Sequence, residues 1–357
     1  MTPPDATPLL AIEGLTVAFD GVPALRGIDL TIHAGEAHGL VGESGCGKSV
    51  TLLAALGLLP RSATVQGSVR LDGRELLGAP AAVLDDIRGG RVAMIFQDPA
   101  SALNPVHRVG AQVTEALRLH RGLDGAAARA EARRLFDLVG IPDPTRRLDA
   151  YPHELSGGQN QRVMIAMALA GEPDLLIADE PTTALDATIQ AQILDLLRKV
   201  QRETGMALIL ISHDLGVIAD VCARVAVMYA GRIVEHGTAE ALFATPLHPY
   251  TRGLLGALPD MDGPRRRLAA IEGSVPEPWA MPAGCAFAPR CGLAVAACRA
   301  DPPPALLPHQ GADDAEISAH LAACHRADPD IRTRAERLAD PAPPVPPSRG
   351  TAVSQGV

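Results

Sequence analysis

Apolar residues in this chain fall into short runs that alternate between two kinds of pattern. One kind is a short apolar run bounded by turn residues, which predicts a buried strand. Such runs lie at residues 36–41, 91–98, 174–180 and 206–213. The other kind has helical apolar spacing and occupies residues 48–59 and 187–204. Strands that alternate with helices predict an α/β fold with a parallel sheet at its core.

Other stretches depart from this alternation. From Leu9 to about Leu30, short strand-like runs are broken by Gly and Pro, which predicts an antiparallel β layer. Residues 107–170 show i, i+3, i+4 apolar spacing over most of their length, which predicts a helical subdomain inserted into the core. Residues 224–237 predict a hairpin that turns at Ala230-Gly231.

We expect the chain to have four parts. They are a tail at 1–8, a core domain at 9–246 that contains the helical subdomain at about 99–170, a C-terminal extension at 247–330 and a tail at 331–357. The last tail is rich in proline, and its composition predicts disorder.

The strongest chemical motif follows the first buried strand. Residues 42–49, GESGCGKS, match the pattern G-x-x-x-x-G-K-[ST] of a P-loop, between a predicted strand and a predicted helix. The predicted phosphate-binding residues are Gly42, Glu43, Ser44, Gly45, Cys46, Gly47, Lys48 and Ser49. Lys48 should reach the β- and γ-phosphates, and Ser49 should bind Mg²⁺. A glycine-rich turn that happens to contain Lys-Ser is the alternative, and the flanking elements argue against it.

A pair of carboxylates ends the strand at 174–180. Asp179 and Glu180 lie where open α/β sheets bind their ligands. Asp179 is a candidate Mg²⁺ ligand, and Glu180 is a candidate to polarise an attacking water. Without the P-loop, an ordinary solvated strand end would explain the pair. Gln97 and His213 end two other predicted strands, where Gln97 could reach the metal or water and His213 the γ-phosphate; each is a weak signal alone.

A second candidate anion site lies in the segment ELSGGQNQRV. Its Ser156-Gly157-Gly158 stands at the start of a predicted helix, a position that favours anions. Lys48 and Ser156 are 108 residues apart, so one chain has two separate candidate phosphate sites.

Together these motifs, with FQDP around Gln97, LLIADEPTTALD and ISHD, resemble those of an ATP-binding cassette (ABC) ATPase in order and spacing, over about residues 9–246. The resemblance implies a P-loop NTPase core that binds ATP and Mg²⁺. It also implies that Asp186 belongs to a loop crossing between subunits and that Phe19 stacks on adenine. The residues that it assigns to the signature motif are Ser156, Gly157, Gly158 and Gln159.

The resemblance also explains why there are two anion sites. In this family two cassettes pack head to tail, so that ATP lies between the P-loop of one and the signature helix of the other. One half-site alone should hydrolyse ATP poorly, because the transition-state charge lacks half its donors. Asn160 departs from the basic residue or Met that relatives often carry there, and we expect little effect. We favour a related, non-identical chain as the second ATPase.

The C-terminal extension narrows the subfamily. PLHPYTRGLL at 246–255 and the later GCAFAPRC resemble the tail of ATPases that serve dipeptide and oligopeptide importers. This likeness implies two integral membrane permease subunits and, indirectly, an extracytoplasmic solute-binding protein. Relatives that import nickel or other small solutes share much of this segment, so those substrates remain an alternative.

Four cysteines are clustered in the extension, with the spacing C-x5-C-x6-C-x25-C. They are Cys285, Cys291, Cys298 and Cys324. Four thiolates around a [4Fe–4S] cluster or Zn²⁺ would cross-link a segment with few apolar residues. His325 is a possible substitute ligand. The spacing lacks the tight C-x2-C pairs of a zinc ribbon, and four free thiols are the alternative.

Composition argues against several other classes of function. The net charge of −9 gives no general attraction to nucleic acid, and a cassette acting on DNA or ribosomes would need a long coiled coil or a second cassette that this sequence lacks. The N-terminus lacks the pattern of a signal peptide, and no apolar run reaches the roughly 18 residues of a membrane span. We therefore expect a soluble protein at the cytoplasmic face of the membrane, held there by permeases.

Overall fold

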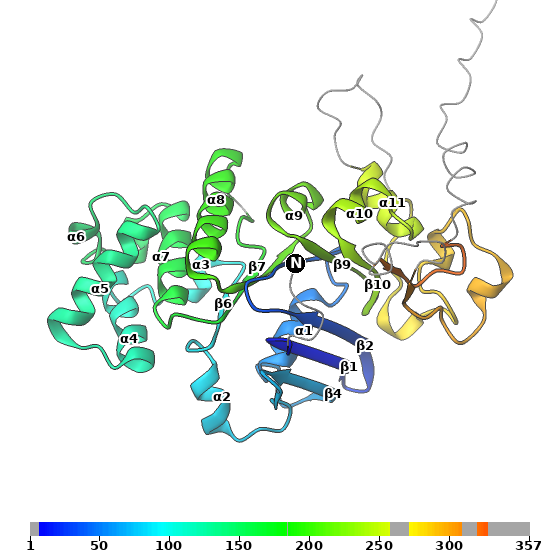
Figure 1. Cartoon of the computed structure of the whole chain (residues 1–357), viewed down its shortest axis with the longest axis horizontal. Coiled ribbons are helices and arrows are strands. Elements are labelled where there is room, and N and C mark those ends of the chain that lie inside the picture. Colours follow the sequence, from blue (N-terminus) through cyan, green and yellow to red (C-terminus); the bar gives the residue numbers. More distant parts are fainter. Residues whose placement is uncertain (1–6, 184, 258–270, 309–319, 328–357) are drawn as a thin grey trace, which may run out of the picture.

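The computed structural model describes residues 7–183, 185–257, 271–308 and 320–327 (Figure 1). The predicted tail at 331–357 and most of the predicted tail at 1–8 lie outside the described residues. Among the described residues, no helix is both long and apolar enough to cross a bilayer.

The main sheet has the strand order β11-β12-β10-β9-β3-β8-β7-β6 within the described residues. Its parallel strands are β3 (Ala37–Val41), β6 (Val92–Ile95), β7 (Leu175–Asp179), β8 (Ala207–Ser212) and β9 (Arg224–Tyr229). Antiparallel strands extend one side, namely β10 (Arg232–Thr238), β11 (Leu307–Pro308) and β12 (Leu321–Ala322). The short strands β11 and β12 come from the C-terminal extension, so that segment adds to the core sheet.

The parallel strands are buried on both faces, as continuous apolar runs require. Leu208 and Leu210 of β8 face a core shared with α8 (Ala187–Thr204) and α9 (Leu215–Val221). The alternate residues Ile209 and Ile211 face α1 (Lys48–Ala55) and the N-terminal sheet. Helix α1 therefore lies between two sheets (Figure 1).

The N-terminal sheet is antiparallel, with the order β2-β1-β4-β5. Its strands are β1 (Leu10–Phe19), β2 (Val22–Ile32), β4 (Ala63–Leu71) and β5 (Arg74–Glu75). We expected short strands broken by Gly. That prediction was wrong, because β1 has 10 residues and β2 has 11. Gly14 (φ 56°) lies within a register shift between Ile12 and Leu15, so the glycine forms a bulge rather than ending the strand.

The helical subdomain is inserted between β6 and β7 and projects to one side of the core (Figure 1). Its helices are α3 (Pro99–Ala102), α4 (Val109–Arg121), α5 (Gly125–Leu138), α6 (Pro144–Arg147) and α7 (Gly157–Leu169), with a 3-10 turn at Pro152–Glu154. Val113, Leu117 and Phe136 are buried at its centre and join the same core cluster as the main sheet. The subdomain is thus continuous with the core.

The remaining helices lie beside the N-terminal sheet and in the C-terminal half of the chain. They are α2 (Ala81–Ile87), α10 (Ala239–Ala244) and α11 (Pro249–Gly256), with 3-10 turns at Pro278–Ala280, Ala288–Arg290 and Ala296–Arg299. The α/β fold class, with its parallel sheet, antiparallel layer and inserted helices, is confirmed.

Candidate nucleotide-binding site

The P-loop connects β3 to α1 in a conformation that needs its glycines. A Cβ on Gly42 (φ 154°) would lie 2.3 Å from the Met228 carbonyl oxygen. A Cβ on Gly47 (φ 106°) would lie 2.6 Å from a methyl group of Leu25. The loop is therefore packed closely against β9 and β2, and a P-loop in this position is expected to bind a phosphate through its backbone N–H groups.

Lys48 is held inside this loop. The residue is only 6% exposed, and its Nζ donates to the Gly42 carbonyl at 2.8 Å and to the Glu43 carbonyl at 3.1 Å. These two bonds place the ammonium where a phosphate in the loop would meet it. The next residue, Ser49, has its side chain hydrogen-bonded to Asp179 at the end of β7.

The Asp179 carboxyl group is suited to a cation. Burial raises its pKa above the usual range, and the neighbouring Glu180 charge raises it further, while Ser49 and Lys48 act in the opposite direction. A buried carboxylate of this kind is stabilised by a nearby cation. The hydroxyl of Ser49 and the carboxylate of Asp179 are oxygen donors of the type that Mg²⁺ prefers.

Glu180 is the centre of a polar cluster. Its Oε2 accepts from Gln97 Nε2 at 3.1 Å and from Thr183 Oγ1 at 3.0 Å, and His213 Nδ1 lies 3.4 Å from the same oxygen. The structure thus brings Gln97, Glu180 and His213 together, although they follow three different strands. Glu180 has φ 45°, an uncommon backbone conformation for a residue other than glycine.

The second candidate anion site is at the start of α7 and opens to a surface cavity. Ser156 Oγ accepts from the Gln159 N–H at 3.3 Å, and Gln159 Oε1 accepts from the Ser156 N–H at 3.1 Å, which forms a capping box. Asp186 caps α8 beside it. A surface cavity of 570 Å³ is lined by both groups, including Gly157 and Gly158, and the described residues of its lining include none from the P-loop.

Comparison with known proteins decides the family. Residues 25–183 match the family model of ABC transporters, and residues 234–298 match that of the oligopeptide/dipeptide transporter, C-terminal region. A putative peptide import ATP-binding protein of Brucella abortus is 53% identical over 82% of this chain and 89% of its own length. The chain belongs to the ATP-binding cassette family. Within it, the chain falls in the dipeptide/oligopeptide importer subfamily, and it is an ATPase.

Other relatives agree with this assignment. The oligopeptide transport ATP-binding protein OppD of Salmonella typhimurium is 48% identical over 84% of this chain and 91% of its own length. Among solved structures, cbiO1 of Clostridium perfringens matches with a TM-score of 0.59 at 30% identity, covering 67% of this chain and 92% of that one. A dimeric cassette, MJ0796, bound to ADP and Pi matches with a TM-score of 0.58 at 28% identity, covering 64% and 98%.

Phe19 is the residue predicted to stack on adenine. It is the last residue of β1 and is partly buried. The adjoining strand β2 approaches the P-loop, since Ala24 and Leu25 lie within contact distance of Gly47. The adenine-stacking role of Phe19 stays a prediction.

The four cysteines of the extension line one small cavity, but as described they are not close enough together to hold a metal ion. Cys285, Cys291, Cys298 and Cys324 line a space of 10 Å³, room for about one water molecule, together with His325. The described residues contain no group of three or more His, Cys, Asp or Glu placed to hold a metal ion. Burial raises the pKa of Cys324 to about 11 and also raises that of Cys285 and Cys291, which favours neutral thiols. The expectation of a [4Fe–4S] cluster or Zn²⁺ is not supported by this geometry.

Two contacts at the P-loop were missed from the sequence. Tyr250 of α11 and Arg290 of the extension both bind Glu43. Each belongs to a stretch that resembles the subfamily's tail, PLHPYTRGLL and GCAFAPRC, but nothing in their spacing indicates a contact with residues more than 200 positions away. Thr183, which binds Glu180, was missed as well.

Proposed function

We propose that this chain is the ATP-hydrolysing subunit that powers the import of dipeptides or oligopeptides through separate membrane permease subunits. The observation that carries the substrate class is the match of residues 234–298 to the oligopeptide/dipeptide transporter C-terminal region. The relatives named above for peptides support it. The nickel alternative is not favoured by any of these comparisons.

The residues have the following proposed roles. Lys48 and the P-loop amides bind the β- and γ-phosphates, and Ser49, Asp179 and Gln97 hold Mg²⁺, which neutralises phosphate charge when bound. Glu180 orients and polarises the attacking water through its free carboxylate oxygen. His213 is largely exposed beside Glu180. It contacts the γ-phosphate and stabilises the negative charge on that group during hydrolysis.

A second cassette completes the site. Ser156, Gly157 and Gly158 present donors in an open cavity that the chain's own P-loop does not line, so we assign them to the partner's nucleotide. Asp186 on the rim of this cavity lies in the segment that crosses between subunits. The partner is a second ABC ATPase, and we favour a related chain, which gives a heterodimer.

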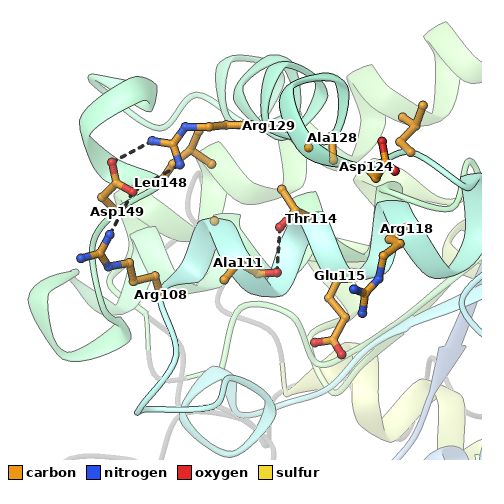
Figure 2. Close-up of a pocket in the computed structure, with 13 residues that line it drawn as sticks. Arg108, Ala111, Thr114, Glu115, Arg118, Asp124, Ala128, Arg129, Leu148 and Asp149 are labelled. Carbon is orange, nitrogen blue, oxygen red and sulfur yellow. Dashed lines mark hydrogen bonds and ion pairs between the residues drawn. The ribbon is translucent and has the colours of Figure 1, made fainter.

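The permeases are proposed to dock on the helical subdomain. Phe96, directly before Gln97, is 42% exposed, and Val106, which ends the segment after Gln97, is 75% exposed. A cavity of 590 Å³ lies nearby between α4 and α5, and at its rim Arg108 and Arg129 both pair with Asp149 (Figure 2). Exposed apolar side chains that flank the segment after Gln97, a member of the Glu180 cluster, suit a protein partner that senses ATP hydrolysis.

This arrangement places the chain at the cytoplasmic face of the membrane, as a peripheral protein held by two integral permease subunits. An extracytoplasmic solute-binding protein delivers the peptide and meets this chain only through the permeases. The acidic net charge gives no support to a partner nucleic acid.

Reconstitution tests the proposal. The complete transporter in vesicles should hydrolyse ATP faster when the solute-binding protein carries a dipeptide or oligopeptide, and the isolated chain should be slow. Glu180→Gln in the same complex should abolish the stimulated rate. Stimulation by nickel but by no peptide would assign the chain to the alternative importer class, and full activity of a monomer would overturn the composite site.

A metal site on the four cysteines remains a proposal. It is supported by the placement of all four thiols around one cavity, and loading would require them to move closer together than they now lie. Iron, sulfide and zinc analysis of anaerobically purified chain, with a visible absorption spectrum, separates a cluster from Zn²⁺. A chain with four titratable free thiols in the extension and no metal would rule the site out.

A further inference from the structure

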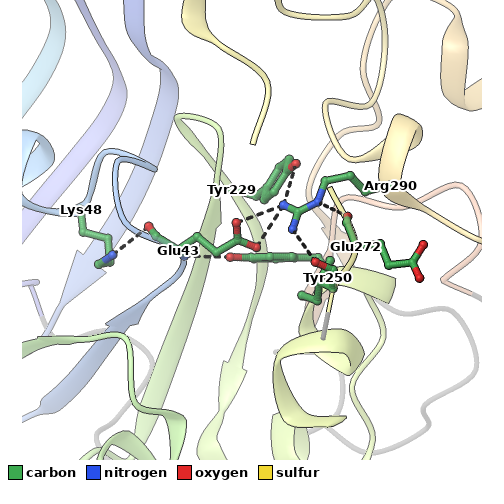
Figure 3. A network of polar contacts seen from close by, with 7 residues as sticks. Glu43, Lys48, Tyr229, Tyr250, Glu272 and Arg290 are labelled. Atoms are coloured by element: carbon green, nitrogen blue, oxygen red, sulfur yellow. Dashed lines mark hydrogen bonds and ion pairs between the residues drawn. The ribbon is translucent and has the colours of Figure 1, made fainter. Parts of the chain in front are cut away.

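The C-terminal extension reaches into the P-loop through one arginine. Arg290 Nη1 lies 3.1 Å and 3.0 Å from the two carboxylate oxygens of Glu43 (Figure 3). The side chain of Arg290 is only 6% exposed, although it ends a short 3-10 turn in a segment rich in loops. A buried cation that meets both oxygens of one carboxylate forms a strong, directional pair.

Contacts on the opposite side fix the orientation of this guanidinium. Its Nε donates to the Glu272 carbonyl at 2.9 Å, and Nη2 donates to the Ile271 carbonyl at 3.3 Å. Nη1 also donates to Tyr229 Oη at 3.3 Å, and the guanidinium carbon lies 5.8 Å from the centre of that ring. The extension therefore presents Arg290 to the P-loop in a single orientation.

Glu43 is held at its backbone as well. Its N–H donates to Tyr250 Oη at 2.8 Å, and its carbonyl accepts from Lys48 Nζ (Figure 3). Tyr250 is fully buried and belongs to α11, outside the P-loop NTPase core. The second residue of the P-loop is thus fixed by its N–H, its carbonyl and its carboxylate, and two of these contacts come from the C-terminal part of the chain.

We propose that Arg290 is a positioning residue for ATP binding, which neutralises Glu43 and keeps its carboxylate directed away from the phosphates. The inference rests on the proposed role of the P-loop as the ATP site. An unpaired carboxylate in the loop would repel a triphosphate, and the repulsion is strong because the site is partly buried. The extension is by this account part of the ATP site.

The test measures ATP affinity in the full-length chain and KM for ATP in the reconstituted transporter. Arg290→Gln should weaken ATP binding and raise KM by about 10-fold, with kcat changed by less than about twofold. Arg290→Lys should recover part of the loss, because it restores the charge without the hydrogen bonds from Nε and Nη2 that orient the side chain. Arg299→Gln, on an exposed arginine of the same extension, is the matched control and should bind ATP normally.

A double variant separates charge neutralisation from a merely structural role. If Arg290 acts by neutralising Glu43, then Glu43→Gln in the Arg290→Gln background should restore ATP affinity to within about threefold of the unmodified chain. A structural role predicts that the double variant binds no better than Arg290→Gln alone. Thermal unfolding without nucleotide identifies any variant that has lost its fold, and Glu43→Gln alone still tests the charge in that case.

The outcomes also separate this inference from the proposed function. Lys48→Ala should abolish ATP binding in either case. If Lys48→Ala lacks ATP binding while Arg290→Gln binds normally, the inference about Arg290 is wrong and the ATP site stands. If Lys48→Ala binds ATP as the unmodified chain does, the P-loop is not the ATP site and both fail.

Discussion

The two helices that begin at candidate anion sites, α1 and α7, differ in how their starts are supported. The start of α1 is enclosed, with Lys48 buried and bonded to two carbonyls of its own loop, and Arg290 and Tyr250 behind Glu43. The start of α7 is open to a surface cavity, and the hydroxyl of Ser156 accepts from Gln159 of its own helix. One helix start is supported by contacts within the chain, and the other opens to a surface cavity.

This difference indicates a division of labour between binding and catalysis. A P-loop held in place by contacts within its own chain can bind ATP in the isolated protein. A site with donors and no phosphate loop of its own can act only on the nucleotide of another molecule. Binding should therefore depend on the α1 side, and hydrolysis should depend on both sides.

Loss of the lysine should have the largest effect. Lys48→Ala removes the only side chain of the P-loop that carries a positive charge to the phosphates, so we expect ATP affinity to fall by at least about 100-fold. Binding of a fluorescent ATP analogue measures this. Lys199→Ala, an exposed lysine of α8, should leave affinity unchanged. Equal affinity in both variants would remove the distinction between the two helix starts.

The next largest effect is expected at the open site. Ser156→Arg fills the outward cavity, so ATP hydrolysis by the assembled transporter should fall by at least about 10-fold, while ATP affinity of the isolated chain stays within about twofold. The substitution also removes a helix cap. Thr238→Ala, which removes the cap of α10, controls for the roughly 1 kcal/mol that a lost cap costs. A loss of ATP binding in Ser156→Arg would contradict the comparison.

The last prediction concerns the pH dependence of stability on the enclosed side, where we expect little effect on turnover. His248 is buried and caps α11 by accepting the Tyr250 N–H at 3.1 Å. Burial lowers its pKa from 6.5 to about 4, with a smaller opposing effect of Glu235 and a lowering effect of Arg252. The unfolded chain takes up this proton below about pH 6.5 and the folded chain only near pH 4, so stability should fall by about 2 kcal/mol between pH 7 and pH 5.

Denaturant unfolding at several pH values measures this change. His248→Asn keeps a capping side chain without a titrating group, so its stability should vary less with pH over the same range. His153→Asn, an exposed position near the open site, should keep the original pH dependence. A steeper dependence in His248→Asn would show that the histidine does not carry the effect.

Local patterns in the sequence predicted much of this molecule. The helix at 187–204 was correct at both ends, because Asp186 caps its start and the left-handed Gly205 follows its end. Gln97, Glu180 and His213 were each weak signals, and their meeting follows from three parallel strands ending at one edge. The helix of the P-loop ends at Ala55 rather than at residue 59, since Gly57 has φ 62° just beyond it.

Contacts between distant segments could not be predicted in this way. The pairing of Arg290 with Glu43 joins positions 247 residues apart, and no periodicity or motif spacing carries that information. For the cysteine cluster, the sequence predicted a site that the geometry does not support. Spacing suggested ligands, but whether thiols bind a metal depends on the distances between them in the folded chain, where side chains such as Phe287 line the same cavity.

ATP-dependent pairing tests the central claim most directly. The chain with Glu180→Gln, in which we expect hydrolysis to be blocked, should form a tighter pair with its partner ATPase in Mg-ATP than in Mg-ADP, measured by sedimentation. Adding Ser156→Arg to that variant should remove the ATP-dependent tightening while leaving ATP bound to the P-loop. Equally tight pairing with and without Ser156→Arg would contradict the account, because the nucleotide would then not lie between one chain's lysine loop and the other's serine–glycine turn.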